Sequence, residues 1–238
     1  MFFPIRDNNP TRGKPYLTVA LITINTLVFL YSYFQGDRGF QLITISYGYI
    51  PNLYLNPSEY AGVPDHLLLT PLTSMFMHGG WMHLIGNMVF LWIFGNNIED
   101  YFGQIKFAIF YLLAGIAAIA LYTAFNPGSE IPLVGASGAI AGVMGAYLVL
   151  HPKAEVTCLI VFFIIQFVVL PAKVVLGIWF ALQIVMSMIG SSSGGGVAWL
   201  AHVGGFVFGY LLLKAIVKVR GGGNISTGDT QRIYRMQW

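Results

Sequence analysis

Four side chains suited to hydrolytic chemistry stand out in an apolar sequence. Ser137 lies in the run of small residues GASGAIAG (135–142), and His202 lies in AHVGGFVFG. A serine hydroxyl becomes a nucleophile when a histidine takes its proton. His83 and Asn87 are four residues apart and project from one helical face, so they and the backbone N–H of Ser137 could donate hydrogen bonds to an oxyanion. These residues together predict acyl transfer.

The composition indicates that this chemistry takes place in a membrane. Of the 238 residues, 56% are hydrophobic and only 9% are charged, whereas soluble domains carry about 25% charged residues. The basic residues cluster near the two termini, which favours membrane orientation over nucleic-acid binding. The single cysteine, Cys158, excludes an intramolecular disulfide and a metal site built from several cysteines.

Six apolar runs are long enough, or nearly so, to cross a bilayer as helices, which takes about 20 residues. They are 16–35, 82–102, 105–125, 137–150, 172–190 and 196–217. The fourth run is short, so we expect its helix to start inside the membrane. We therefore expect an all-α membrane protein with six transmembrane helices.

Charge placement predicts the orientation of these spans. Basic residues before the first span and after the last put both termini in the cytoplasm, which requires an even number of crossings. Lys153 and Lys173 bracket the apolar stretch 156–170, which we interpret as an interfacial or re-entrant element rather than a seventh span. The connection 36–77 is predicted to be a long outer loop that packs on the membrane surface, with a plain extracellular loop as the alternative.

Three regions follow from this layout. Residues 1–15 form a short polar segment on the cytoplasmic side, residues 16–217 form the six-span domain, and residues 218–238 form a cytoplasmic tail that we expect to be disordered because it is polar and rich in glycine.

The topology brings the candidate residues to one depth. Spans two, four and six all run from outside to inside, and His83, Asn87, Ser137 and His202 each lie near the start of one of them. We therefore expect a single site near the outer face of the bilayer. A seventh span would instead place His202 on the side opposite Ser137.

Two stripes of glycine could bring the serine and the histidine together. Gly138, Gly142 and Gly145 share one face of the fourth span, and Gly205 and Gly209 share a face with His202 on the sixth. Small residues allow membrane helices to approach closely. The alternative is that the glycines only pack helices and serve no catalytic geometry.

Residues and motifs that the sequence lacks limit the possible mechanisms. No Asp or Glu lies in the outer half of a span, so the residues offer a dyad, and an aspartyl intramembrane protease is disfavoured. The H-E-x-x-H motif of metalloproteases is also missing. A channel or transporter with a broken fourth helix remains an alternative, as does a haem or metal carrier that uses His78, His83 and His202.

The motifs resemble those of the rhomboid intramembrane serine proteases. Gly135–Gly138 is similar to the family's G-x-S-G nucleophile motif, and His83 with Asn87 to its H-x-x-x-N oxyanion motif. His78 resembles a further histidine upstream. The general-base motif A-H-x-x-G-x-x-x-G is matched by Ala201, His202, Gly205 and Gly209.

The resemblance implies a six-helix rhomboid-like bundle and an activity. Ser137 would be the nucleophile and His202 the general base and acid of an endopeptidase that cleaves single-span membrane proteins near the outer face of the bilayer. No cofactor, metal or nucleic acid is expected. The protein would be a multi-pass protein of the bacterial inner membrane, and the loop 190–196 is a candidate gate for substrate.

Two departures from the family pattern bear on these expectations. Ala141 stands four residues after the serine, where members often have an aromatic residue that stacks on the base, so His202 must be held in another way. The Trp-Arg pair of some members is not evident in 36–77. A catalytically silent relative that binds membrane clients is the alternative function.

Overall fold

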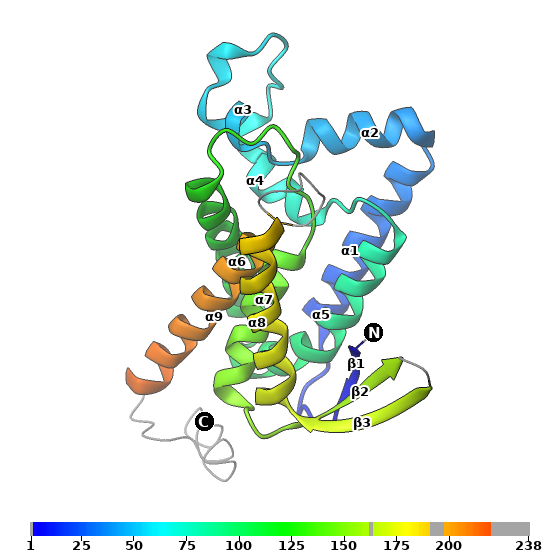
Figure 1. The fold of residues 1–238 in the computed structure, drawn as a ribbon, viewed down its shortest axis with the longest axis vertical. Helices are drawn as coiled ribbons and strands as arrows, with labels where there is room; N and C mark the ends of the chain where they lie inside the picture. The colour runs from blue at the N-terminus through cyan, green and yellow to red at the C-terminus, as the bar shows by residue number, and fades with distance from the viewer. Residues whose placement is uncertain (1, 162–163, 191–197, 220–238) are drawn as a thin grey trace.

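The computed structural model describes residues 2–161, 164–190 and 198–219, and a bundle of helices dominates this part of the chain (Figure 1). The helices of 14 residues or more within it are α1 (Tyr16–Tyr33), α5 (Trp81–Phe102), α6 (Gln104–Phe125), α7 (Ser137–Leu150), α8 (Ala172–Gly190) and α9 (Trp199–Val219). Helix α7 occupies the centre and contacts α5, α6, α8 and α9. The core of the protein is therefore built around α7.

These helices coincide with the six apolar runs to within a few residues. Within the described residues, α1, α6, α8 and α9 are long and apolar enough to cross a membrane. The protein is therefore an integral, multi-pass membrane protein. Helix α7 has only 14 residues and α5 carries polar side chains at both ends, so the count of six spans stays a prediction.

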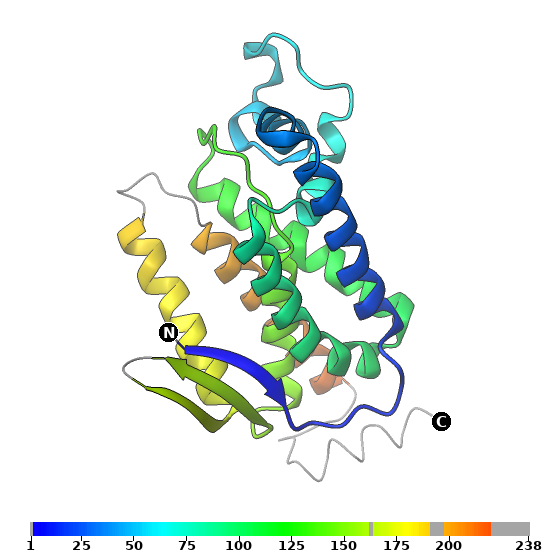
Figure 2. The ribbon, with the colours of Figure 1, turned by 90° about the vertical axis from the view of Figure 1, so that its right-hand side faces the viewer.

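The connection 36–77 is folded into short helices at one end of the bundle (Figures 1 and 2). Within it, α2 spans Gly36–Tyr47, α3 spans Pro51–Leu55 and α4 spans Thr70–Thr73, and three-residue 3-10 helices cover Pro57–Glu59, Leu67–Leu69 and Ser74–Phe76. Tyr49 pairs with Leu133, and the backbone N–H of Gly135 donates to the carbonyl of Ser74 at 2.9 Å. The connection thereby holds the segment that leads into α7, while its contact with a membrane surface stays a prediction.

A three-stranded antiparallel sheet lies at the end of the bundle opposite the 36–77 connection (Figure 2). The expectation that the protein is all-α is therefore wrong in this region. The strands of the sheet are β1 (Phe2–Asp7), β2 (Glu155–Val161) and β3 (Ile165–Pro171), in the order β1-β2-β3. The register places Cys158 opposite both Pro4 and Val168. The stretch 156–170 is therefore a hairpin rather than a helix, and its position relative to a membrane stays a prediction.

The two faces of the hairpin explain why its sequence is apolar throughout. Val156 and Cys158 of β2 are buried in the core, whereas Ile165, Phe167 and Val169 of β3 are exposed on the other face. A strand with apolar residues on both faces lacks the alternation of a half-buried strand. The sequence pattern therefore could not distinguish this hairpin from an apolar helix.

The polar segment 1–15 is bound to the bundle. The Asp7 carboxylate at the end of β1 accepts hydrogen bonds from the Tyr147 hydroxyl at 2.7 Å and from Asn97 Nδ2 at 2.9 Å. Burial raises the pKa of the Asp7 carboxyl, and these hydrogen bonds oppose that rise. The backbone N–H of Gly13 donates to Asp100 Oδ1 at 2.9 Å. The middle and the C-terminal part of the segment are thus tied to the bundle, mainly to the end of α5.

Glu99 of α5 caps the start of α1. Helix α1 begins after Pro15 without a side-chain cap of its own. Glu99 Oε1 accepts from the backbone N–H of Leu17 at 2.8 Å, and Oε2 accepts from the backbone N–H and the hydroxyl of Thr18 at 2.7 and 2.8 Å. The first N–H groups of a helix have no partner within the helix, and a carboxylate also interacts favourably with the positive end of the helix dipole. Glu99 therefore fixes α1 against α5.

Two predicted regions lie wholly or largely outside the described residues. Of the predicted tail 218–238, Lys218 and Val219 belong to α9, and 220–238 lie outside. Of the predicted gate 190–196, residues 191–196 also lie outside.

The cap on α1 yields a stability prediction. We expect Glu99→Ala to lower the free energy of unfolding in detergent by roughly 2–6 kcal/mol, because the backbone N–H groups of Leu17 and Thr18 lose their acceptor and each such unsatisfied group costs about 1–3 kcal/mol. Glu59→Ala, which changes an exposed glutamate in the 36–77 connection, should stay within about 0.5 kcal/mol of the wild type. Equal unfolding free energies for the two variants would contradict the assignment.

Candidate active site

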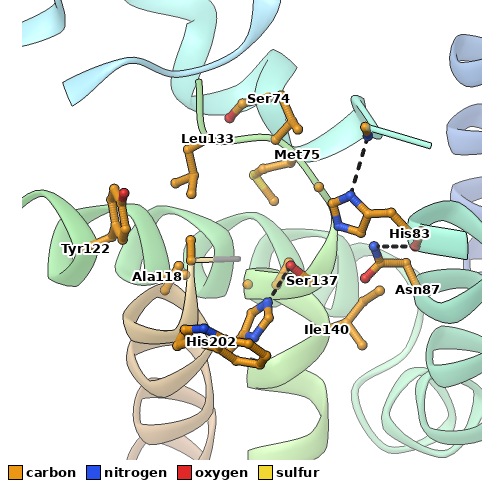
Figure 3. A pocket seen from close by; sticks show the side chains of 18 of the residues that line it. Ser74, Met75, His83, Asn87, Ala118, Tyr122, Leu133, Ser137, Ile140 and His202 are labelled. Atoms are coloured by element: carbon orange, nitrogen blue, oxygen red, sulfur yellow. Dashed lines mark hydrogen bonds between the residues drawn. The ribbon is translucent and has the colours of Figure 1, made fainter. Parts of the chain in front are cut away.

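The structure brings Ser137 and His202 into hydrogen-bonding contact. Ser137 is the first residue of α7, and His202 lies one turn into α9. Ser137 Oγ and His202 Nε2 are 2.7 Å apart (Figure 3). Because Ser137 begins its helix, its backbone N–H has no acceptor within the helix. A hydroxyl next to an imidazole and a free N–H is the arrangement that a serine nucleophile requires.

Glycines bring the two helices close enough for this contact. A Cβ atom on Gly205 would overlap the carbonyl oxygen of Gly138, and one on Gly209 would overlap that of Gly142. A Cβ on Gly145 would likewise overlap the carbonyl oxygen of Phe206. On its other side, Gly138 packs against Ala118 of α6. The two predicted stripes therefore do face each other, and the backbones of α7 and α9 are in direct contact.

His83 and Asn87 line the same pocket as the serine and the histidine. The pocket has a volume of about 1220 Å³ among the described residues, and its wall includes Ser137, His202, His83 and Asn87. Figure 3 shows the side chains of these four residues gathered around the start of α7. Tyr122, Asn126 and Ser129 add polar groups to the wall beside the 126–136 connection. The four residues that were predicted to lie at one depth therefore line one cavity.

Gly135 keeps the space between His83 and Ser137 open. Its φ of +125° lies in the region that favours glycine. A Cβ atom there would come 2.7 Å from His83 Nε2 and 3.5 Å from Ser137 Oγ. Any larger residue at position 135 would therefore strain the backbone and push into the space that separates the two side chains.

The imidazole ring of His78 packs against that of His83. The side chain of His78 is buried, and its ring centroid lies 5.1 Å from that of His83 in an edge-on arrangement. Burial, and secondarily the neighbouring His83, lower the pKa of the His78 imidazole to about 3. His78 is therefore neutral at physiological pH, and it is not part of the pocket wall.

Gln183, which is not among the residues predicted from the sequence, contacts the histidine. Gln183 of α8 places its Oε1 2.8 Å from His202 Nδ1. The rings of Trp179 and Trp199 also flank His202, with centroid distances of 5.9 and 6.2 Å. Ala141, where relatives often carry an aromatic residue, is fully buried. His202 is thus held from α8 and by the tryptophans instead of from α7.

A signal for Gln183 was present in the sequence. It is the only strongly polar side chain between Lys173 and Ser187. The predicted site residues lie at the starts of spans two, four and six, whereas Gln183 lies in the second half of the fifth. Since α8 runs in the opposite direction to α7 and α9 (Figure 1), that half lies at the level of the site.

The described residues also bear on the alternative of a metal carrier. Among them, no group of three or more His, Cys, Asp or Glu side chains is placed to hold a metal ion. Both ring nitrogens of His202 have protein partners, Ser137 and Gln183. The arrangement around His202 therefore favours proton transfer over metal ligation.

Comparison with known proteins identifies the family. Residues 66–219 match the model of the Rhomboid domain. The chain is 32% identical over 136 residues to "Rhomboid protease GluP" of Bacillus subtilis, which covers 57% of this chain and 25% of that protein. It is 30% identical over 182 residues to "RHOMBOID-like protein 2" of Arabidopsis thaliana, which covers 73% of this chain and 50% of that protein.

A mitochondrial relative extends the comparison. "Rhomboid protein 1, mitochondrial" of Saccharomyces cerevisiae is 30% identical over 161 residues, which cover 62% of this chain and 42% of that protein. The matches to these three relatives thus span between a quarter and a half of the relatives' own length. The Rhomboid domain match covers α5, α6, α7, α8 and α9, which supply His83, Asn87, Ser137, Gln183 and His202. The chain therefore belongs to the rhomboid family.

Proposed function

We propose that the protein is an intramembrane serine endopeptidase that uses Ser137 and His202 as a catalytic dyad. The observation that carries the proposal is the 2.7 Å contact between Ser137 Oγ and His202 Nε2 inside a pocket among apolar helices. The similarity to "Rhomboid protease GluP" supports a proteolytic activity.

The chemistry proceeds in two halves. Ser137 Oγ attacks the carbonyl carbon of the scissile peptide while His202 Nε2 takes the hydroxyl proton, which gives a tetrahedral intermediate. The C–N bond then breaks as His202 returns the proton to the leaving amine, and an acyl-enzyme on Ser137 remains. A water molecule, deprotonated by His202, hydrolyses the ester and restores the serine. No cofactor enters either half.

His83, Asn87 and the backbone N–H of Ser137 are the proposed oxyanion donors. His83 Nδ1 is an acceptor for the backbone N–H of Gly79 at 3.4 Å, and a neutral imidazole then carries its proton on Nε2. That Nε2 faces Gly135 and the serine. Asn87 Nδ2 donates one hydrogen to the His83 carbonyl at 2.9 Å, which leaves its second hydrogen for a substrate.

We further propose six membrane spans with both termini in the cytoplasm. In that orientation the pocket lies toward the outer face of the bilayer, and the polar wall formed by Asn126 and Ser129 gives water a route to it. The substrates would be single-span membrane proteins cut near the outer end of their helix. The membrane would be a bacterial inner membrane, with residues 16–217 as the protease domain.

The alternative function is that of a catalytically silent rhomboid-like protein that binds membrane clients. Client binding requires neither a serine nucleophile nor a base. The paired Ser137 and His202 therefore favour the protease.

The proposed function is tested by covalent labelling with a fluorophosphonate probe, which needs no knowledge of the substrate. We expect the purified wild type to be labelled at Ser137, and Ser137→Ala and His202→Ala to lose labelling, because the first lacks the nucleophile and the second its base. Ser46→Ala, which changes a serine outside the pocket wall, should label like the wild type. Each variant is compared by intact mass after equal exposure.

The same assay tests the oxyanion donors. We expect His83→Ala and Asn87→Ala to be labelled roughly 100- to 1000-fold more slowly, since loss of one oxyanion donor costs on the order of 10²–10³ in rate. A folded wild-type protein that takes no label would overturn the protease proposal, and undiminished labelling of Asn87→Ala would overturn its role as a donor.

The six-span proposal is tested by cysteine accessibility. In a Cys158→Ala background, we expect Lys153→Cys and Lys173→Cys to resist a membrane-impermeant maleimide added outside intact cells and to react after the cells are opened, because both positions lie at the cytoplasmic end. Asn126→Cys, at the opposite end of the bundle, should react from outside. External labelling of position 153 or 173 would show that the count is wrong.

A further inference from the structure

A glutamine in the middle of an apolar helix contacts the proposed base directly. Gln183 belongs to α8, and only 4% of its surface is exposed. A buried amide inside a membrane helix is costly unless its hydrogen-bonding groups find partners. Gln183 has a partner for each end of its amide, and these two partners determine which way the amide faces.

The orientation of the amide follows from its contact with its own helix. Gln183 Nε2 lies 3.2 Å from the backbone carbonyl oxygen of Trp179, one turn earlier in α8. A carbonyl oxygen can only accept a hydrogen bond, so the amide nitrogen must be on this side. The amide oxygen Oε1 therefore faces His202 Nδ1, at 2.8 Å.

The orientation of the amide in turn fixes the tautomer of the histidine. Because Oε1 can only accept, His202 Nδ1 must carry a proton and donate it. A neutral imidazole has a single N–H, so Nε2 is left with a lone pair. That lone pair faces Ser137 Oγ at 2.7 Å, and the serine hydroxyl is the donor in this contact. Three hydrogen bonds thus connect the Trp179 carbonyl, Gln183, His202 and Ser137. Only one assignment of donors and acceptors satisfies all three.

We propose that Gln183 is a positioning residue that holds His202 in the tautomer with the proton on Nδ1, so that Nε2 can take the proton of Ser137. The catalytic consequence rests on the proposed protease function, whereas the tautomer itself does not. Gln183 thereby has the place that a carboxylate holds in a serine–histidine–aspartate triad.

A neutral amide suits this place better than a carboxylate. An ionised Asp or Glu would be a charge buried among apolar helices, and the desolvation of such a charge is costly. The amide oxygen supplies an acceptor without a net charge. When His202 becomes an imidazolium during catalysis, its Nδ1–H bond to Oε1 becomes charge-assisted and therefore stronger.

Two tryptophans limit the other motions of the imidazole. The Trp179 ring lies tilted against one side of His202, and the Trp199 ring meets it edge-on. Trp179 therefore acts twice, since its carbonyl orients the Gln183 amide and its ring packs on His202. The rings restrict the place of the imidazole, while Gln183 determines which of its nitrogens carries the proton.

The tautomer is measured by nitrogen-15 NMR of protein labelled at histidine and reconstituted in bilayers, with the His202 signals assigned from their absence in His202→Ala. We expect a protonated Nδ1 and an unprotonated Nε2 in the wild type. Gln183→Met, which keeps the length of the side chain and removes the amide oxygen, should lose this single state. Gln183→Glu, which keeps an acceptor, should retain a protonated Nδ1.

The rate of cleavage of a single-span membrane substrate or of probe labelling gives the second readout. We expect Gln183→Met to lower kcat about 10- to 100-fold with little change in KM, since one buried hydrogen bond is lost. Gln183→Glu should recover most of that loss, and Gln104→Met, at the exposed start of α6, should match the wild type. A general loss of folding would instead reduce the Met and Glu variants alike.

The outcomes separate this inference from the proposed function. A wild-type His202 with its proton on Nε2, or a folded Gln183→Met variant that keeps both the wild-type tautomer and the wild-type rate, overturns the role of Gln183. A protonated Nδ1 that depends on Gln183, in a protein that takes no probe at Ser137, supports the positioning and overturns the protease.

Discussion

The direct contact between the backbones of α7 and α9 is the constraint on which the site depends. At Gly205 and Gly209 of α9, a single added carbon would overlap a carbonyl oxygen of α7. In lipid, helices gain little from hydrophobic burial against each other, so close packing of small residues is a main source of their association. Because the contact starts at Gly138, next to Ser137, and at Gly205, about one turn from His202, it also brings Ser137 Oγ to 2.7 Å from His202 Nε2.

The remaining elements hold this pair of helices and complete the candidate site. Helix α5 supplies His83 and Asn87, and α8 supplies Gln183. The 36–77 connection holds the approach to α7 through the contact between Ser74 and Gly135. Hydrogen bonds to the end of α5 and to Tyr147 tie the N-terminal segment to the opposite end of the bundle.

The sequence predicted the helices and most of the site because both depend on local patterns. Six apolar runs gave helix bounds close to those observed, and the shared direction of three spans brought Ser137, His202, His83 and Asn87 to one pocket. The sheet was missed because Pro4 pairs with Cys158, more than 150 residues away, and the strands show no clean alternation. Gln183 was missed because its role depends on the rotation of α8 about its axis, which an apolar sequence does not specify.

The central claim is that the approach of α7 to α9 creates the reactive pair, and Gly205→Ala tests it most directly. The measurement is the rate of fluorophosphonate labelling of Ser137 per folded molecule, with Gly177→Ala as the control because a Cβ at that position of α8 meets no atom within 4 Å. We predict that Gly205→Ala labels at least about 10-fold more slowly, because a shift of roughly 1 Å in a reacting group can cost on the order of 10²-fold in rate, and that Gly177→Ala labels like the wild type. Labelling of folded Gly205→Ala at the wild-type rate would contradict the account.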